Sequence, residues 1–270
     1  MFYLIAGIIT RIVSNSYINV FQKILTNKGE KSSAVNFYTY LGLSTAGIFF
    51  IKSVPYTILP DILTMGILGA AGNYFIIKAL SVGELSVLAP INSYKPVVAL
   101  IFGIIFLKEI PSLTAIFAIL LIIYGTFFIS GSVKGNSKAI LYRFIALICS
   151  GSEAIFIKKI ILATGSLNTF ILWCLAGLIF SAIPVILSKQ KPSVRDMKYQ
   201  ILLILAVGIM QLSTNFVFER MNVSYALALF QLSTLLSVFL GVNIFNEKNL
   251  KKKVIGSVIM IAGAIILLLN

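Results

Sequence analysis

The sequence predicts an all-α integral membrane protein whose ten transmembrane helices form two inverted repeats of five. Three observations support this prediction. Hydrophobic residues make up 59 % of the 270 residues and charged residues only 11 %, whereas an average soluble domain has about 25 % charged residues. The apolar segments are about 20 residues long, which is the length that a helix needs to cross a bilayer. The two halves of the chain also share motifs at a constant spacing.

The apolar segments are predicted to be helices because lipid leaves a spanning backbone only two solutions, helices and closed barrels. The segments show no alternation of polar and apolar residues, which a barrel strand would require. The most polar linker, GSVKGNSK, lies at 131–138. We therefore predict a first repeat at 1–131, a linker at 132–138 and a second repeat at 139–270. The ten spans are expected at 2–24, 34–52, 62–80, 85–107, 112–130, 139–161, 167–188, 199–218, 223–245 and 253–269.

Three residue pairs in the two halves are each separated by 138 positions. The first half contains GIIFLKE at 103–109 and the second contains GVNIFNE at 241–247. Because a unit of five spans is odd, the second copy enters the membrane from the opposite face. Inverted repeats are typical of secondary transporters, whose sites lie near the midplane between the repeats. The pairs are Gly103 and Gly241, Glu109 and Glu247, and Gly125 and Gly263.

The segment 78–130 resembles the second half of an EamA domain of the drug/metabolite transporter superfamily. That family shows a small-residue turn after the third span, a proline in the fourth, a Gly-x5-Glu motif and a late glycine in the fifth. The matching residues here are Ser81–Ser86, Pro90 or Pro96, Gly103 with Glu109, and Gly125.

The resemblance extends to the second half and so covers essentially the whole chain as two domains. Gly241, Glu247 and Gly263 recur there, but Ala228 and Thr234 stand where the proline would be. The resemblance implies a transporter that holds its substrate between spans 1, 3 and 4 of one half and spans 6, 8 and 9 of the other.

The same six spans carry polar residues in their interiors, mostly three or four positions apart and therefore on one helical face. Spans 5 and 10 have no interior charge, Asn or Gln, and are interpreted as flanks facing lipid or another subunit. The alternative for each amide is a helix–helix hydrogen bond without ligand contact. The candidate substrate-binding residues are Arg11, Asn15, Asn19, Asn73, Asn92, Lys95, Glu153, Gln211, Asn215 and Gln231.

Arg11, Lys95 and Glu153 lie deepest in their spans. A charge at a helix centre costs about 2.5–3.5 kcal/mol on insertion scales, which is tolerable only beside water, a counter-charge or a ligand. Two cations and one carboxylate favour a substrate with a carboxylate or phosphate group. Glu153 would then bind an ammonium group, carry protons or neutralise a cation. The alternative is a structural ion pair between Glu153 and a cation.

Pro90 and Pro96 both fall within the fourth predicted span. Proline lacks an amide hydrogen and clashes with the carbonyl four residues before it. We predict a hinge at these two prolines, with a static kink as the alternative.

The predicted function is secondary transport of a small polar metabolite, an amino acid or a related organic anion or zwitterion, by alternating access. One alternative is transport of a larger organic anion or nucleotide-linked metabolite, and another is a non-transporting membrane scaffold or sensor. The chain has no histidine, no paired carboxylates at catalytic spacing and no metal-ligand cluster. We therefore expect no enzyme activity, no catalytic residues, no metal and no cofactor.

The expected partners are the lipid bilayer and a small-molecule substrate, with protons as a candidate coupling ion, for a monomer or homodimer. The net charge of +14 lies mainly in short loops and their flanks, Arg143 included, so nucleic acid is not an expected partner. The composition favours a multi-pass protein of the bacterial cytoplasmic membrane. The excess of Lys and Arg after the odd-numbered spans predicts both termini outside, whereas the family resemblance implies cytoplasmic termini for many members.

Overall fold

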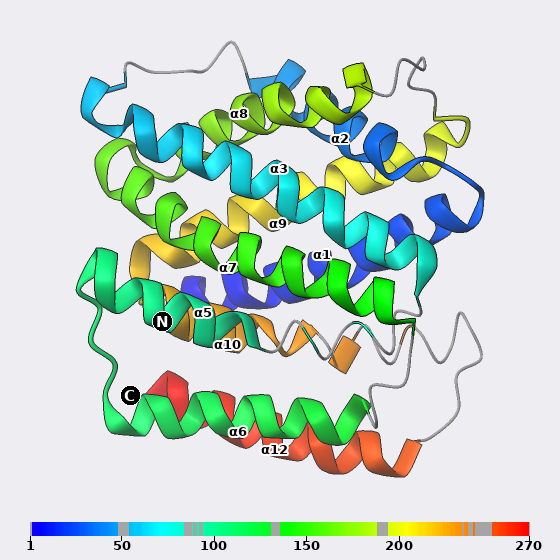
Figure 1. Cartoon of the computed structure of the whole chain (residues 1–270). Coiled ribbons are helices and arrows are strands. Elements are labelled where there is room, and N and C mark those ends of the chain that lie inside the picture. Colours follow the sequence, from blue (N-terminus) through cyan, green and yellow to red (C-terminus); the bar gives the residue numbers. More distant parts are fainter. Residues whose placement is uncertain are drawn as a thin grey trace.

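The computed structural model describes residues 2–47, 54–83, 94–130, 136–187, 194–233 and 250–269, with the single residues 88, 91, 235, 236 and 240. These residues contain ten α-helices and no strand, which confirms the predicted all-α fold (Figure 1). The helices are α1 (Phe2–Asn27), α2 (Ser32–Gly47), α3 (Leu59–Val82), α5 (Lys95–Phe102), α6 (Leu113–Ser130), α7 (Ser137–Thr164), α8 (Ser166–Leu187), α9 (Met197–Arg220), α10 (Val223–Phe230) and α12 (Leu250–Leu269). A 3-10 turn at Tyr56–Ile58 leads into α3, and a π-helical turn at Gly103–Leu107 extends α5.

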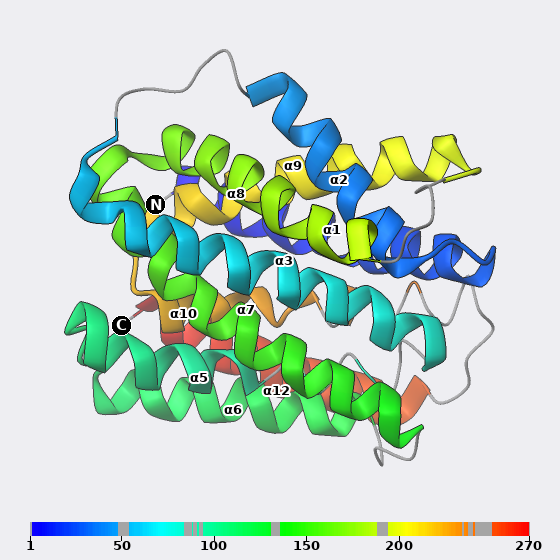
Figure 2. The same cartoon turned by 45° about the horizontal axis from the view of Figure 1, so that its top comes forward.

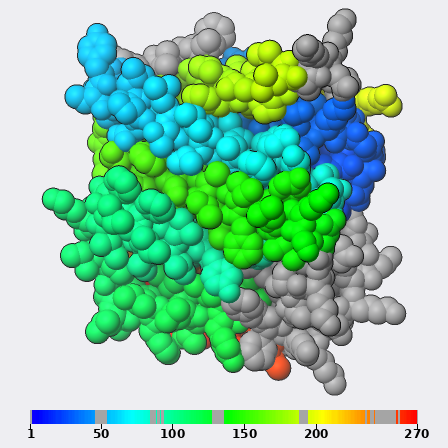
Figure 3. Space-filling model, in the orientation of Figure 1, coloured from blue at the N-terminus to red at the C-terminus, as the bar shows by residue number. Residues whose placement is uncertain are grey.

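The outer surface of this helix bundle is apolar. Large side chains such as Ile105, Leu120 and Ile179 are more than half exposed, which water would disfavour and lipid tails would accept. Figure 3 shows one face of this surface, built from α3, α7, α5 and α6. Within the described ranges, five helices are long and apolar enough to cross a membrane, namely Phe2–Asn27, Tyr56–Val82, Ser137–Thr164, Ser166–Leu187 and Met197–Arg220. The chain is therefore a multi-pass membrane protein.

The two halves run in opposite directions, and the first helix of each half packs against the third helix of the other. In Figure 1, α6 runs from left to right, whereas α12 runs from right to left and ends beside the C-terminal label. Helix α3 of the first half packs along α7 of the second, and α1 packs along α9 in the same way. Figure 2 shows the same pairs side by side from a second direction. This reciprocal packing is the arrangement that an inverted repeat produces.

Glycines permit close contacts between helices at the flank of the bundle. A Cβ on Gly125 of α6 would lie 2.7 Å from the carbonyl oxygen of Gly256, and a Cβ on Gly263 of α12 would lie 2.8 Å from that of Ala118. The two backbones therefore approach too closely for any side chain at these positions. Small residues at such crossings allow extensive van der Waals contact, which drives helix association in lipid.

Neither the fourth nor the ninth span is one continuous helix over its predicted range; the sequence predicted a hinge at Pro90 and Pro96 in the fourth and has no matching proline in the ninth. Helix α5 begins only at Lys95, and Pro96 occupies its first turn, where the missing amide hydrogen removes no helical bond. Helix α10 ends at Phe230, and the amides of Gln231 and Leu232 bond to carbonyls three residues earlier. The ninth span is thus interrupted without a proline. Pro90 and Asn92 lie outside the described residues.

Candidate functional site

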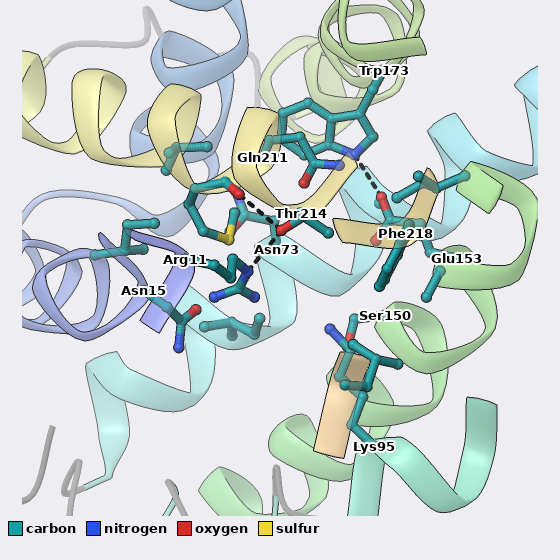
Figure 4. A pocket seen from close by; sticks show the side chains of 18 of the residues that line it. Arg11, Asn15, Asn73, Lys95, Ser150, Glu153, Trp173, Gln211, Thr214 and Phe218 are labelled. Carbon is teal, nitrogen blue, oxygen red and sulfur yellow. Dashed lines mark hydrogen bonds between the residues drawn. The ribbon is translucent and has the colours of Figure 1, made fainter. Parts of the chain in front are cut away.

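A polar chamber lies at the centre of the bundle, between the two repeats (Figure 4). It encloses a cavity of about 110 Å³. Its lining comes from α1, α3 and α5 of the first half and from α7, α9 and α10 of the second, with Tyr40 of α2 and Trp173 of α8. These are the six predicted spans and their immediate neighbours. Because α3 packs on α7 and α1 on α9, polar faces far apart in the sequence meet at one place.

The chamber brings together most of the candidate residues. Gln231 instead lines a smaller adjoining cavity of about 50 Å³, which shares Arg11, Asn15, Asn19 and Lys95 with the chamber. Asn215 lines neither cavity: its Nδ2 donates to the Ser166 carbonyl oxygen at 3.0 Å, and its Oδ1 accepts from Gln211. The candidate residues that line the chamber are Arg11, Asn15, Asn19, Asn73, Lys95, Glu153 and Gln211. Their role in substrate binding stays a prediction.

Arg11 is buried in the chamber wall and has no acidic partner among the residues that the structure describes. Its Nε donates to Thr214 Oγ1 at 2.7 Å, and its guanidinium carbon lies 4.8 Å from the centre of the Phe230 ring. The Nη1 atom is buried and has no hydrogen-bond partner within the described part of the chain. Thr214 and Phe230 belong to the second repeat, so this side chain crosses the interface. The guanidinium is thus held at its Nε edge by a residue of the other repeat.

Glu153 stands on the opposite wall, where it accepts a hydrogen bond of 2.6 Å from Trp173 Nε1. A Cβ on Gly69 would lie 2.4 Å from Glu153 Oε1, so only glycine leaves room for this carboxylate beside α3. The ring of Tyr40 lies 4.9 Å from that of Trp173 and packs over Gly177, where a Cβ would approach to 2.1 Å. Three helices thus fix the position of one buried carboxylate.

Lys95 enters the chamber from the first residue of α5. The ion pairs formed by the described residues join Lys28 to Asp196, Lys159 to Asp61 and Arg220 to Glu219. None of them includes Lys95 or Glu153. The structural ion pair that the sequence left open as an alternative is therefore not formed directly, and both groups face the cavity.

Several chamber amides are held by other amides rather than left free. Gln22 Nε2 donates to Asn73 Oδ1 at 3.2 Å, and Asn73 in turn donates to Asn36, whose Nδ2 donates to the Ala70 carbonyl. The network links α1, α2 and α3 of the first repeat. Both polar atoms of the Asn73 side chain therefore have partners on other helices. This is the helix–helix hydrogen bonding that the sequence offered as the alternative to ligand contact.

Several residues of the two cavities were not among the candidate residues, and five of them contribute to the site. Gln22 lies on the polar stripe that Arg11, Asn15 and Asn19 form in the sequence, but it was not included among the candidates. Tyr40 and Trp173 do not belong to a polar stripe on their helices. They line the chamber only because of the way that α2 and α8 pack. The five residues are Gln22, Tyr40, Arg143, Trp173 and Thr214.

Contacts between the repeats occur at both ends of the bundle. At the end with the α1–α2 turn, Lys28 pairs with Asp196, and Glu30 Oε1 accepts from the Arg195 amide at 2.7 Å. The hydrogen bond with Asp196 raises the pKa of Lys28, and the same bond lowers the pKa of Asp196. At the other end, a different ion pair and a different hydrogen bond join the repeats. Lys159 Nζ lies 2.6 Å from Asp61 Oδ1, and Glu109 Oε2 accepts from the Val223 amide at 2.9 Å.

The fold and the site define a class: a polytopic all-α membrane protein with a polar chamber between two inverted repeats. The model of the EamA-like transporter family matches residues 2–131 and again 137–269. The chain therefore belongs to the EamA-like transporter family, a group of membrane transporters within the drug/metabolite transporter superfamily. No curated protein matches the chain.

A solved structure, described only as a crystal structure of a protein, has a similar fold. It superposes with a TM-score of 0.74 at 16 % sequence identity, over 98 % of this chain and 96 % of the other. At this identity the likeness shows the fold alone.

Proposed function

We propose that the chain is a secondary transporter that moves a small polar metabolite with an anionic group, an amino acid or a related organic anion or zwitterion, by alternating access. The observation that carries this proposal is the pair of chamber cations, Arg11 and Lys95, that lack an acidic partner within ion-pair distance among the described residues. Buried cations are tolerated when a counter-charge reaches them. An anionic substrate would supply that charge.

Each charged group has a distinct role in this proposal. Arg11 Nη1, which has no hydrogen-bond partner, and the Lys95 ammonium would bind the carboxylate of an amino acid. The Glu153 carboxylate would bind the ammonium group of the amino acid, and the hydrogen bond from Trp173 Nε1 would hold the Glu153 side chain in position. Charge-assisted bonds of this kind are about twice as strong as neutral ones, which would favour a charged substrate over water.

Alternating access would open one end of the chamber while the other stays closed. The contacts of Lys28 with Asp196 and of Lys159 with Asp61 join the repeats at opposite ends, so each set would break in one of the two states. Helix α5 begins only at Lys95 and α10 ends at Phe230, and broken helices near the site are a feature of many transporters. The hinge at Pro90 and Pro96 remains part of this proposal.

The direct test is a metabolite panel screened by thermal stabilisation of the purified protein, followed by flux into proteoliposomes. A ligand that binds the folded state raises the melting temperature by mass action. Lys95→Ala should abolish the shift for the true substrate, while Lys198→Ala, at an exposed position outside the chamber, should keep it. Equal shifts in both variants would contradict the assignment of Lys95.

A separate experiment addresses proton coupling. Glu153 is the one acidic residue of the described part that lines the chamber, so it is the candidate proton carrier. Transport by Glu153→Gln in proteoliposomes should lose the pH dependence of the wild type. An unchanged pH profile would exclude this role and leave exchange or facilitated diffusion as the energetic basis.

The alternative of a non-transporting scaffold predicts a chamber that water and solutes do not enter. Cysteines placed at Asn73 and Gln211 in a chain without its native cysteines would then resist water-soluble thiol reagents. Labelling at both positions, slowed by substrate, is the result expected of a transporter.

A further inference from the structure

A second buried arginine, Arg143, lies beside the chamber. It is 4 % exposed, and it lines the adjoining cavity of about 50 Å³ together with Arg11 and Lys95. Asn15, Asn19, Gln231 and Ser233 also line this cavity and contribute uncharged polar groups. Sequence reasoning had grouped Arg143 with the basic flanks of the loops, whereas the structure places it inside the bundle.

The sequence position of Arg143 explains why it points inward. It precedes Ser150 by seven residues and Glu153 by ten on α7, which are two and nearly three turns of one helical face. Both of those residues line the chamber. Arg143 therefore lies on the same stripe, and α7 turns it toward the cavity and away from lipid.

The hydrogen bonds of Arg143 hold it in place without satisfying it. Its Nε donates to the Leu88 carbonyl oxygen at 3.2 Å, and its Nη1 is buried with no hydrogen-bond partner among the residues described. Arg11 shows the same arrangement, with Nε bonded to Thr214 and Nη1 unpartnered. Both arginines line the same small cavity and are anchored at Nε, and the Nη1 atom of each has no hydrogen-bond partner among the described residues. A planar guanidinium is well suited to binding carboxylate or phosphate oxygens.

The charges of the two cavities do not balance. Arg11, Lys95 and Arg143 carry three positive charges, and Glu153 is the one described acidic residue that lines either cavity. Two positive charges remain. A zwitterionic amino acid, with no net charge, would leave this surplus in place, whereas a group with two negative charges would remove it.

We propose that Arg143, Arg11 and Lys95 form an anion subsite, and that the transported substrate presents to it a dianionic group, either a phosphoryl group or a pair of carboxylates. This inference rests on the proposed function and narrows its substrate class. Glu153, on the other side of the chamber, would bind a hydrogen-bond donor or ammonium group of the same molecule.

The experiment measures binding of serine, phosphoserine, aspartate and orthophosphate by thermal stabilisation of the wild-type protein. Serine and phosphoserine differ only by the phosphoryl group, and aspartate carries a second carboxylate in its place. Phosphoserine or aspartate should bind at least about 10-fold more tightly than serine, because one charge-assisted hydrogen bond contributes about that factor. Tighter binding of phosphoserine would identify the dianionic group as a phosphoryl group, and tighter binding of aspartate would identify it as a pair of carboxylates. Serine binding as tightly as both of them, or no stabilisation by any dianion, would overturn the proposal.

Two variants then test Arg143 itself. Arg143→Gln should weaken the dianionic ligand by about 10- to 100-fold and leave serine unchanged, and Arg143→Lys should restore part of the loss. Arg195→Gln, at an exposed position, is the matched control and should bind like the wild type. An equal loss for both ligands in Arg143→Gln and Arg143→Lys would assign Arg143 a structural role only and overturn the subsite.

Flux measurements separate the two proposals. Binding of a dianion that depends on Arg143, without flux in proteoliposomes, would contradict the proposed transport while leaving the subsite intact. Flux of a dianion that is insensitive to Arg143→Gln would support transport and overturn the subsite.

Discussion

The walls of the chamber and the flanking pair of α6 and α12 differ in the residues that they bury between helices. Helices α1 and α7 bury Arg11, Arg143 and Glu153, whereas the residues described as buried on α6 and α12 are apolar except for glycines and Thr126. Thr126 bonds to the Ile122 carbonyl within its own helix. Thr126 Oγ1 also donates to Met260 Sδ of α12 at 3.6 Å, so the flank joins two membrane helices without a buried charge among its described residues.

The difference indicates that the charges of the walls are not needed for packing. Buried ions are weak evidence for stability because their desolvation offsets their attraction. Their presence in the walls, and their absence from the described flank, is better explained by a ligand. Substitutions in the walls should therefore affect binding more than stability, and substitutions in the flank should do the reverse.

The largest effect is expected from Arg11→Met. This change removes one of the three cavity cations while keeping an apolar chain of similar length, so it should weaken an anionic substrate by about 100-fold. The melting temperature without substrate should stay the same or rise, because an unpaired buried charge is removed. Binding isotherms and thermal unfolding measure the two effects. A lower melting temperature with unchanged affinity would contradict the functional interpretation of the walls.

The converse effect is expected from Gly125→Leu in the flank. Its Cβ would lie 2.7 Å from the Gly256 carbonyl oxygen, so α6 and α12 must separate, at a cost of about 1–3 kcal/mol typical of overpacking. The melting temperature should fall while the dissociation constant of the substrate stays unchanged. Leu120→Ile, at a lipid-facing position of the same helix, is the control. A change in affinity as large as that of Arg11→Met would show that the two regions are not separable.

A smaller effect is expected from Trp173→Phe. The substitution keeps the ring that packs on Tyr40 and removes the donor to Glu153. Loss of one hydrogen bond to a charged group corresponds to about 1.5 kcal/mol, or roughly 10-fold in affinity for an ammonium-bearing substrate. Tyr40→Phe removes a buried hydroxyl that has no hydrogen-bond partner in the described ranges and should change affinity less. The reverse order would identify the Tyr40 hydroxyl as the ligand contact.

The smallest effect is expected from Asp196→Asn at the end of the bundle. Its pKa is lowered and that of Lys28 is raised by their mutual hydrogen bond. Their contribution to stability is therefore complete between about pH 5 and 9, is lost as pH falls through the lowered pKa of Asp196, and is lost as pH rises through the raised pKa of Lys28. The difference in melting temperature between variant and wild type should be small and constant across that window, with substrate affinity unchanged. A difference that varies within the window would indicate another titrating partner.

Much of the architecture could be predicted from the sequence because lipid imposes strong local rules. Length and hydropathy located the helices, and the recurring Gly103 and Gly241 motifs indicated the repeat. Seven of the ten candidate residues line the chamber, because polar side chains at helical spacing share a face whatever their partners. The break after Phe230 could not be predicted, since no proline or glycine marks it and only the packing around α10 determines it.

What the sequence by itself determined was therefore the class of protein, the two repeats and the faces of the helices that meet. Only the tertiary structure decided which charges meet: that Glu153 bonds to Trp173, that Lys95 and Glu153 form no direct ion pair, and that Arg143 shares a cavity with Arg11. The physical reason is the range of the forces. Helix formation and hydropathy act within about a turn of the chain, whereas each of these contacts depends on the axial position and rotation of one helix relative to another.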